Sequence, residues 1–345
     1  MTTPRTRPGR GRVQAAYAIL AAVLLASACT AGAPDPRPSA PSASQVRPQY
    51  AALVEAVVAH GGKVWIETDL LKAWLAGADA YQGVLSRVVA LADRPGVDGV
   101  KIADELGYRD GASPQQARDF LTHTTAAIHR ALPGRKVLVD LIVPELGCAA
   151  WVEQSGPSHE RRAQCASAAR ERDPAATLAA VDGYVASGGL DVVDLSAGLL
   201  SEGEYAAWGT TRNAVMAAAW DEAHRRWGSH VRLQARKALA HPGRYPGTAA
   251  SAAADVETFV DLPLAHGARA VDVWTWSQPY KDGTYQLTDP GLASNPLVEQ
   301  LRTRRGRGVE LWTHMTPSSL QVGPAADVAA ATAIFSTVFV ASGTG

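Results

Sequence analysis

The stretch ARAVDVWTWSQPY, residues 268–280, sets an aspartate and two tryptophans at alternate positions of an otherwise largely apolar run. A period of two is typical of a β-strand, so Asp272, Trp274 and Trp276 are expected on one face, and the valines and the threonine between them on the other. Such a strand needs an apolar environment on one side and a polar, aromatic-lined environment on the other.

Seven further segments have strand patterns, and segments with helical periodicity lie between them. With 270–276, the predicted strands are 63–69, 98–105, 136–143, 190–196, 231–237, 308–314 and 335–341. Eight strands that alternate with helices predict one α/β domain, a (β/α)₈ barrel over residues 49–345. No outer helix follows the last strand, and the helical segment 49–61 is expected to take its place. A doubly wound open sheet is the alternative fold.

The mixed rows of the strands decide between these folds. In an open parallel sheet covered on both faces, strands are nearly continuous apolar runs. Here most strands carry one apolar row and one mixed row, which in a barrel would line the lumen. The residues predicted to face the lumen are Trp65, Glu67, Asp69, Lys101, Glu105, Asp140, Asp194, Ser196, Gln234, Arg236, Asp272, Trp274, Trp276, Glu310, Trp312 and His314.

Several carboxylates beside tryptophans suit a carbohydrate, because rings stack on sugars, polar groups bind hydroxyls, and two carboxyl groups can cleave a glycosidic bond. We predict Glu105 as general acid with Asp194 as its partner. Asp140 is the second candidate, since it is expected deeper in its strand and nearer to Lys101. The predicted substrate-binding residues are Glu67, Asp69, Gln234, Arg236, Trp274, Trp276, Trp312 and His314. The alternative is that Lys101 and Arg236 fill the barrel as ion-pair partners of these acids.

Other barrel chemistries lack their sequence marks. The first strand carries Glu67 and Asp69 where metal-dependent amidohydrolases have His-x-His, and no G-x-S-x-G elbow, P-loop or dinucleotide fingerprint occurs. We therefore expect neither metal nor cofactor. The 33 Lys and Arg balance the 33 Asp and Glu, so no excess charge attracts nucleic acid. A monomer with a carbohydrate substrate is expected.

In architecture and pocket composition, residues 50–345 resemble the broad group of bacterial barrel glycoside hydrolases and hydrolase-like lipoproteins of actinobacterial type. The resemblance implies a glycoside hydrolase, or a barrel that binds carbohydrate without cleaving it. Where one large clan ends its fourth strand in Asn-Glu, this chain has Asp194-Leu195-Ser196, and the chitinase-like DGxDxDxE pattern is absent.

The N-terminus has the pattern of an export signal over residues 1–28, with four arginines before a short apolar run. The run ends in LLASAC, residues 24–29, which resembles the bacterial lipobox and implies lipidation of Cys29. Residues 29–48 are rich in Pro, Ala and Ser and are expected to be a disordered tether. The chain is thus predicted to lie outside the cytoplasm, either anchored to the outer face of the cell membrane by its lipid or secreted.

Two further cysteines, Cys148 and Cys165, lie in an insertion at about 146–175. In an exported protein such a pair is most simply a disulfide. The insertion follows the third strand, so we expect it at the rim of the barrel face that carries the chemistry.

Overall fold

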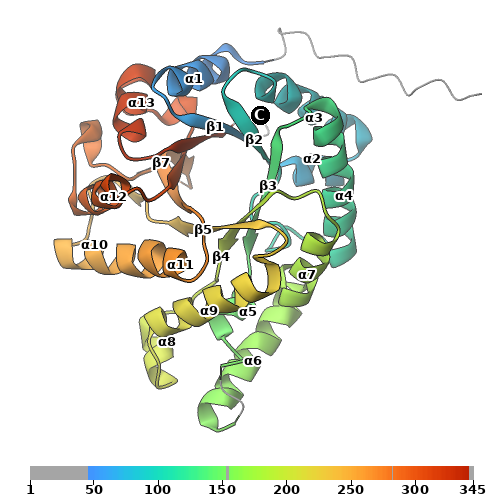
Figure 1. Cartoon of the computed structure of the whole chain (residues 1–345), viewed down its shortest axis with the longest axis vertical. Helices are drawn as coiled ribbons and strands as arrows, with labels where there is room; N and C mark the ends of the chain where they lie inside the picture. Colours follow the sequence, from blue (N-terminus) through green and yellow to red (C-terminus); the bar gives the residue numbers. More distant parts are fainter. Residues whose placement is uncertain (1–45, 153–154, 282, 342–345) are drawn as a thin grey trace, which may run out of the picture. The chain divides into compact units, whose positions relative to one another are not determined.

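The computed structural model describes residues 46–152, 155–281 and 283–341. The predicted signal peptide, Cys29 and most of the predicted tether lie outside the described residues. Eight parallel strands form the centre (Figure 1): β1 Lys63–Glu67, β2 Val97–Lys101, β3 Lys136–Ile142, β4 Val192–Ser196, β5 Arg232–Ala238, β7 Val271–Tyr280, β9 Leu311–Met315 and β10 Thr337–Ala341.

The sheet closes on itself. From β1 the strands pair in sequence order through β2, β3, β4 and β5, then β7, β9 and β10, which pairs with β1 again. This closure makes the fold a (β/α)₈ barrel and excludes the open sheet, because an open sheet would leave two unpaired edges. All eight predicted strands are present.

Helices surround the barrel (Figure 1). They are α1 Pro48–Ala59, α2 Leu70–Ala76, α3 Ala78–Ala92, α4 Pro114–Ala131, α5 Pro144–Cys148, α6 Pro157–Arg172, α7 Leu178–Ala186, α8 Glu202–Ala207, α9 Arg212–Trp227, α10 Ala249–Val256, α11 Leu262–Ala265, α12 Pro296–Gly306 and α13 Pro324–Thr332. The N-terminal helix α1 packs against α13, β1 and β10. It therefore covers the wall where a last outer helix would stand, as expected.

The larger apolar core lies between the strands and the helices, and a smaller cluster consists of Trp65, Leu138, Val192, Ala270, Trp312 and Phe339. The smaller cluster plugs the lumen near the amino ends of the strands, where Trp65 and Trp312 lie with ring centroids 5.4 Å apart. Gly99 makes room for it, because a Cβ there would lie 2.6 Å from the Trp65 ring.

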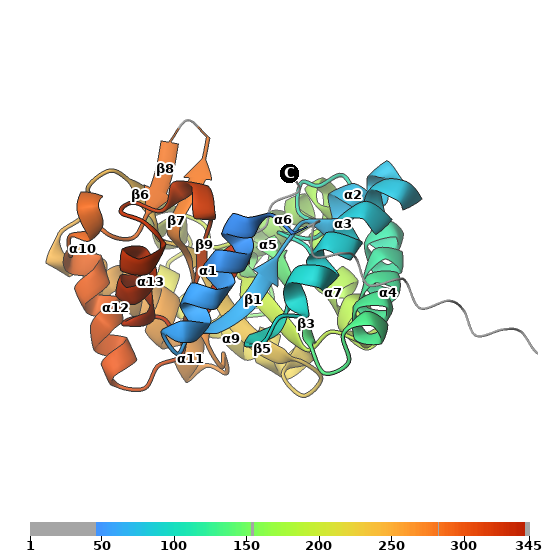
Figure 2. The same ribbon diagram turned by 90° about the horizontal axis from the view of Figure 1, so that it is seen from above.

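One strand extends beyond the barrel. The end of β7 pairs antiparallel with β8, Gly283–Gln286, which pairs in turn with β6, His241–Pro242. Figure 2 shows this hairpin projecting from one end of the barrel. Between Val273 and Ser277 the pairing of β7 with β9 shifts register, and the peptide bond between Trp274 and Thr275 is cis.

Candidate active site

A layer of buried polar side chains lies above the apolar plug. Seven strands contribute one each, and all have at most 9% of their surface exposed: Glu67, Lys101, Asp140, Asp194, Gln234, Asp272 and His314. The alternation of side chains along the strands predicted this layer correctly, since all seven residues were expected to face the lumen. Burial of so many polar groups is stable only where charges are paired.

His314 bridges two acids across the lumen. Its Nδ1 lies 2.6 Å from Glu67 Oε2, and its Nε2 lies 2.7 Å from Asp272 Oδ2. Burial alone would lower the pKa of His314, but the carboxylates of Asp272 and Glu67 outweigh burial and raise it to about 9. Both ring nitrogens therefore carry protons at neutral pH, and the imidazolium stacks on Phe339 with 4.6 Å between ring centroids.

Lys101 is the second buried cation. Its Nζ lies 2.8 Å from Glu67 Oε1, 3.1 Å from Asp104 Oδ1 and 3.3 Å from Asp140 Oδ2. Burial disfavours its charge, but Glu67, Asp104 and Asp140 raise the pKa of Lys101 well above its ordinary value. Burial would raise the pKa of Glu67, yet His314 and Lys101 hold it at about 2.

Arg236 joins this layer to the open end of the barrel. Its Nε lies 2.9 Å from Asp140 Oδ2, while its two terminal nitrogens lie 3.1 Å from Glu105 Oε1 and 3.4 Å from Asp104 Oδ1. The Arg236 side chain is 10% exposed, that of Glu105 36% and that of Asp104 51%. We call these three residues, with Asp140 beneath them, the acidic mouth.

Two of the buried acids have raised pKa values. Burial raises the pKa of Asp140 to about 8 against the opposing charges of Arg236 and Lys101, and Asp140 hydrogen-bonds Asp104. Burial and the neighbouring acids Asp272 and Asp140 raise the pKa of Asp194 well above its ordinary value, and Asp194 hydrogen-bonds Asp272. In each pair the acid with the raised pKa keeps a proton more readily than its neighbour.

Cations oppose the effect of burial at the other acids of the lumen. Burial opposes ionisation of Asp104 and Asp272 too, but Lys101 and Arg236 lower the pKa of the first and His314 that of the second. The carboxylates of Glu67, Asp104 and Asp272, and that of Glu105 at the rim, pair with the three cations Lys101, Arg236 and His314. The ion pairing foreseen as the alternative is present.

The predicted catalytic acids lie at different depths. Asp194 pairs in register with Asp140, so the expectation that Asp140 lies deeper in its strand is wrong. Both are fully buried, whereas Glu105 lies on the loop after β2 at the rim, beside Arg236. Asp194 is therefore separated from solvent, and Asp140 is the acid that joins the mouth.

Asp104 is a mouth residue that the sequence analysis missed. Strand parity was extended from Lys101 to Glu105, which placed Asp104 outside the lumen, but β2 ends at Lys101. Beyond that point the alternation no longer holds, and Asp104 turns back to Lys101. The signal in the sequence for this residue was the pair of adjacent acids, Asp104 and Glu105, at the end of a predicted strand.

Trp274 and Trp276 separate onto different sides of the barrel wall. Trp274 is partly exposed, and its ring lies 5.4 Å from that of Tyr280 and 5.9 Å from that of Tyr285 on the hairpin. Trp276 is 1% exposed, donates to Asp327 of α13 at 3.2 Å and contacts Phe335. The prediction that Trp276 lines the lumen is wrong, because the register shift in β7 interrupts the alternation.

Trp312 has the predicted face but a different height. It is the second residue of β9 and belongs to the apolar plug, with its indole N–H donated to Glu310 at 2.9 Å. Glu310 in turn pairs with Arg232 at 3.0 Å. The prediction that Trp312 binds substrate is wrong, because Trp312 lies in the plug, at the opposite end of the lumen from the mouth.

Asp69 and Gln234 complete the predicted binding residues. Asp69 precedes α2 at the rim, where burial and the charge of Asp104 raise its pKa. Gln234 is fully buried, and its side-chain amide has no hydrogen-bond partner among the described residues. Asp69 therefore lies with the mouth, and Gln234 with the closed layer beneath it.

The insertion after β3 contains the predicted disulfide. Cys148 at the end of α5 bonds to Cys165 in α6, with the two Cα atoms 5.6 Å apart. Glu145 in α5 accepts from Arg170 and from the backbone N–H of Leu178, both at 2.7 Å. Glu145 is therefore a partner that fastens the insertion.

Within the part of the chain that the structure describes, no group of three or more His, Cys, Asp or Glu residues is arranged to hold a metal ion. None of the helices within the described ranges has the length and apolar character needed to cross a bilayer.

No protein-family model and no curated protein matches the chain. Among solved structures, the chain is similar to 2,3-dimethylmalate lyase at 14% identity, with 85% of this chain and 77% of that one covered and a TM-score of 0.36. It is also similar to the β-glycosidase BGL167 at 13% identity, with 86% and 76% covered and a TM-score of 0.35. For a β-glycosidase from Pyrococcus horikoshii the values are 12% identity, 81% and 83% covered, and 0.38. These likenesses concern the barrel fold alone.

Proposed function

We propose that the barrel is a carbohydrate-active enzyme that cleaves a glycosidic bond at the acidic mouth. The observation that carries the proposal is the placement of Asp104 and Glu105, both solvent-accessible, on the two terminal nitrogens of one guanidinium, Arg236. Most enzymes that cleave glycosidic bonds use a pair of carboxyl groups that flank the bond. The mouth lies at the carboxyl ends of the strands, where barrel enzymes carry their chemistry.

The two carboxyl groups have different roles in this proposal. Asp140 holds a proton up to a pKa of about 8 and hydrogen-bonds Asp104. In this proposal Asp104 takes that proton and passes it to the leaving glycosidic oxygen, which leaves Asp140 ionised between Arg236 and Lys101. Glu105 faces Arg236 as a carboxylate, and it acts as nucleophile or as base toward water. Asp140 acts through Asp104 as the proton reserve, a role that its pKa of about 8 fits near neutral pH.

Substrate contact is assigned to the rim. Trp274, Tyr280 and Tyr285 form a ring cluster on the hairpin, and Tyr280 is 44% exposed. In register, Trp274 aligns with Ala238, two residues beyond Arg236 on β5. Aromatic faces at this height suit sugar rings held above the acids, and Asp69 is placed to accept from a hydroxyl.

The second candidate function is carbohydrate binding without cleavage. It is favoured by the ion pairs of Arg236, because a guanidinium that holds both mouth carboxylates also compensates their charge. Both functions need the mouth to bind sugar, and only turnover separates them.

A screen of bacterial and plant polysaccharides for new reducing ends tests the proposal. Once a substrate is found, Asp104→Asn and Glu105→Gln are each expected to lower turnover by at least about a hundredfold. Asp98→Asn is the matched control, since Asp98 lies at the other end of β2 with 42% of its side chain exposed. Normal turnover in the Asp104 or Glu105 variant would remove that residue from the mechanism. Sugar binding by the wild type without turnover across the screen would favour the binding module.

We also propose that the enzyme is held at the outer face of the membrane by a lipid on Cys29. The support is the LLASAC stretch after an apolar run. Cys29→Ala is expected to move the protein from the membrane fraction into the medium with its folding unchanged, and retention of this variant by the membrane would contradict the anchor.

A further inference from the structure

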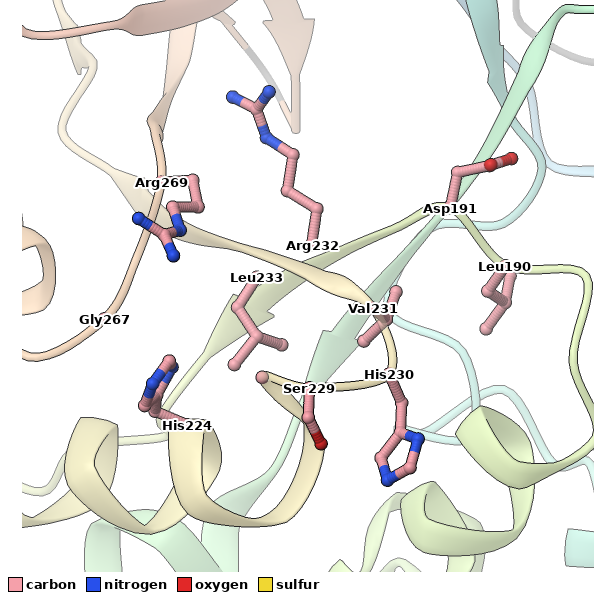
Figure 3. Close-up of a pocket in the computed structure, with 11 residues that line it drawn as sticks. Leu190, Asp191, His224, Ser229, His230, Val231, Arg232, Leu233, Gly267 and Arg269 are labelled. Atoms are coloured by element: carbon pink, nitrogen blue, oxygen red, sulfur yellow. The ribbon is translucent and has the colours of Figure 1, made fainter.

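A hollow of about 520 Å³ opens on the face opposite the mouth. It is formed by the end of α9 and by the loops that lead into β4, β5 and β7, so it lies at the amino ends of those strands. Its volume is in the range of pockets that hold small molecules. Among the residues that line it are Asp191, His224, Gly228, Arg232, Gly267 and Arg269 (Figure 3).

The lining is basic. Its single acid, Asp191, accepts from the backbone N–H of Val137 at 2.8 Å and lies 3.4 Å from His129. Figure 3 shows this carboxylate turned away from the side of the hollow where Arg269 and His224 lie. The Asp191 charge is therefore directed to a different part of the molecule.

Arg269 is the uncompensated cation of the hollow. Within the described ranges its side chain has no ion-pair or hydrogen-bond partner, whereas Arg232 pairs with Glu310 at 3.0 Å. Figure 3 shows the guanidinium of Arg269 turned toward His224 and that of Arg232 turned to the opposite side. The hollow thus offers one unpaired guanidinium, that of Arg269.

Glycines fix the position of the His224 imidazole beside Arg269. A Cβ at Gly228 would lie 2.4 Å from His224 Nδ1, and one at Gly267 would lie 2.6 Å from the same atom. Any side chain at either position would displace the ring. The nearby end of α9 adds few free acceptors, because the carbonyls of His224 and Trp227 already accept from Gly228, His230 and Val231.

We propose that this hollow binds a small ligand through an oxyanion group, a phosphate or sulfate, held by Arg269 with support from His224. A guanidinium matches the geometry of such a group and binds it through paired hydrogen bonds. The site is separate from the mouth and does not depend on the proposed function.

Calorimetric titration with inorganic phosphate and with sulfate, at constant ionic strength set by chloride, tests this inference on the wild-type protein. Saturable binding of one ion per chain is expected, and Arg269→Gln should weaken it by about tenfold or more, the value of one charged hydrogen bond. Arg307→Gln is the matched control, because Arg307 is an exposed arginine without a partner in the described residues, on the loop before β9.

Two results would overturn the proposal: no saturable binding, or equal weakening by both arginine variants. Gly267→Ala gives an independent reading, since displacement of His224 should weaken phosphate binding while Arg269 is retained. Thermal melting of each variant shows whether the fold is kept.

Discussion

Removing the buried imidazolium should cost the fold much of its stability. In His314→Gln, the carboxylates of Glu67 and Asp272 lose the cation that each contacts at 2.6 and 2.7 Å. The rise of the pKa of His314 from 6.5 to about 9 corresponds to roughly 3 kcal/mol, since each tenfold change in proton affinity is about 1.4 kcal/mol. Breaking a buried ion pair costs about 3–5 kcal/mol in other proteins. We expect a loss of about 3 kcal/mol at pH 6.

The sign of the pH dependence follows from the raised pKa. The folded state holds the His314 proton more tightly than the unfolded state, so the stabilisation is complete below pH 6.5 and is lost as pH rises through about 9. The difference in unfolding free energy between wild type and His314→Gln should therefore shrink between pH 6.5 and 9.

Urea unfolding of both proteins at pH 6, 7.5 and 9.5 measures this difference directly. His129→Gln is a suitable control, because the His129 side chain lies outside the lumen, is 39% exposed and is 3.4 Å from Asp191. A loss below about 1 kcal/mol at pH 6, or a difference that stays constant up to pH 9.5, would refute the assignment of His314 as a buried imidazolium.

Three other predictions concern different parts of the molecule. Trp276→Ala should lower the free energy of unfolding by about 3–5 kcal/mol, because it empties a core site. Trp274→Ala should weaken sugar binding with little loss of stability. Ligand titration and thermal melting of both variants measure these effects. Reduction of the Cys148–Cys165 bond, which spans 17 residues, should lower stability by about 3 kcal/mol in denaturant. Turnover should fall as pH rises through about 8, because the proton shared by Asp140 and its neighbour is then lost; a rate unchanged up to pH 9.5 would contradict that donor.

The fold could be predicted because a period of two and a period of 3.6 leave clear marks over eight repeats. The height of each side chain along the barrel was harder to predict. The predicted segment 308–314 begins three residues before β9 does, at Leu311, and the difference moved Trp312 from the mouth to the plug. Strand ends are set by pairing with neighbours, which a single segment does not encode.

The site was predictable in composition and less so in geometry. Alternation placed Glu67, Asp140 and His314 inside the lumen correctly because they lie within regular strands. It failed at Trp276, where the register of β7 shifts, and at Asp104, which lies beyond the end of β2. Both failures occur where the backbone departs from regular pairing, near the carboxyl ends of strands where barrel sites are built.

The ion pairs of the lumen explain why the mouth can hold a proton. Lys101, Arg236 and His314 already pair with the carboxylates of Glu67, Asp104, Asp272 and Glu105, so a further buried carboxylate would lack compensation. The pKa values of Asp140 and Asp194 are accordingly raised. Of these two, only Asp140 hydrogen-bonds an acid that reaches solvent, Asp104. The ion pairs that stabilise the barrel thus leave one transferable proton on Asp140. Its neighbour Asp104 reaches the rim, where a substrate can receive the proton.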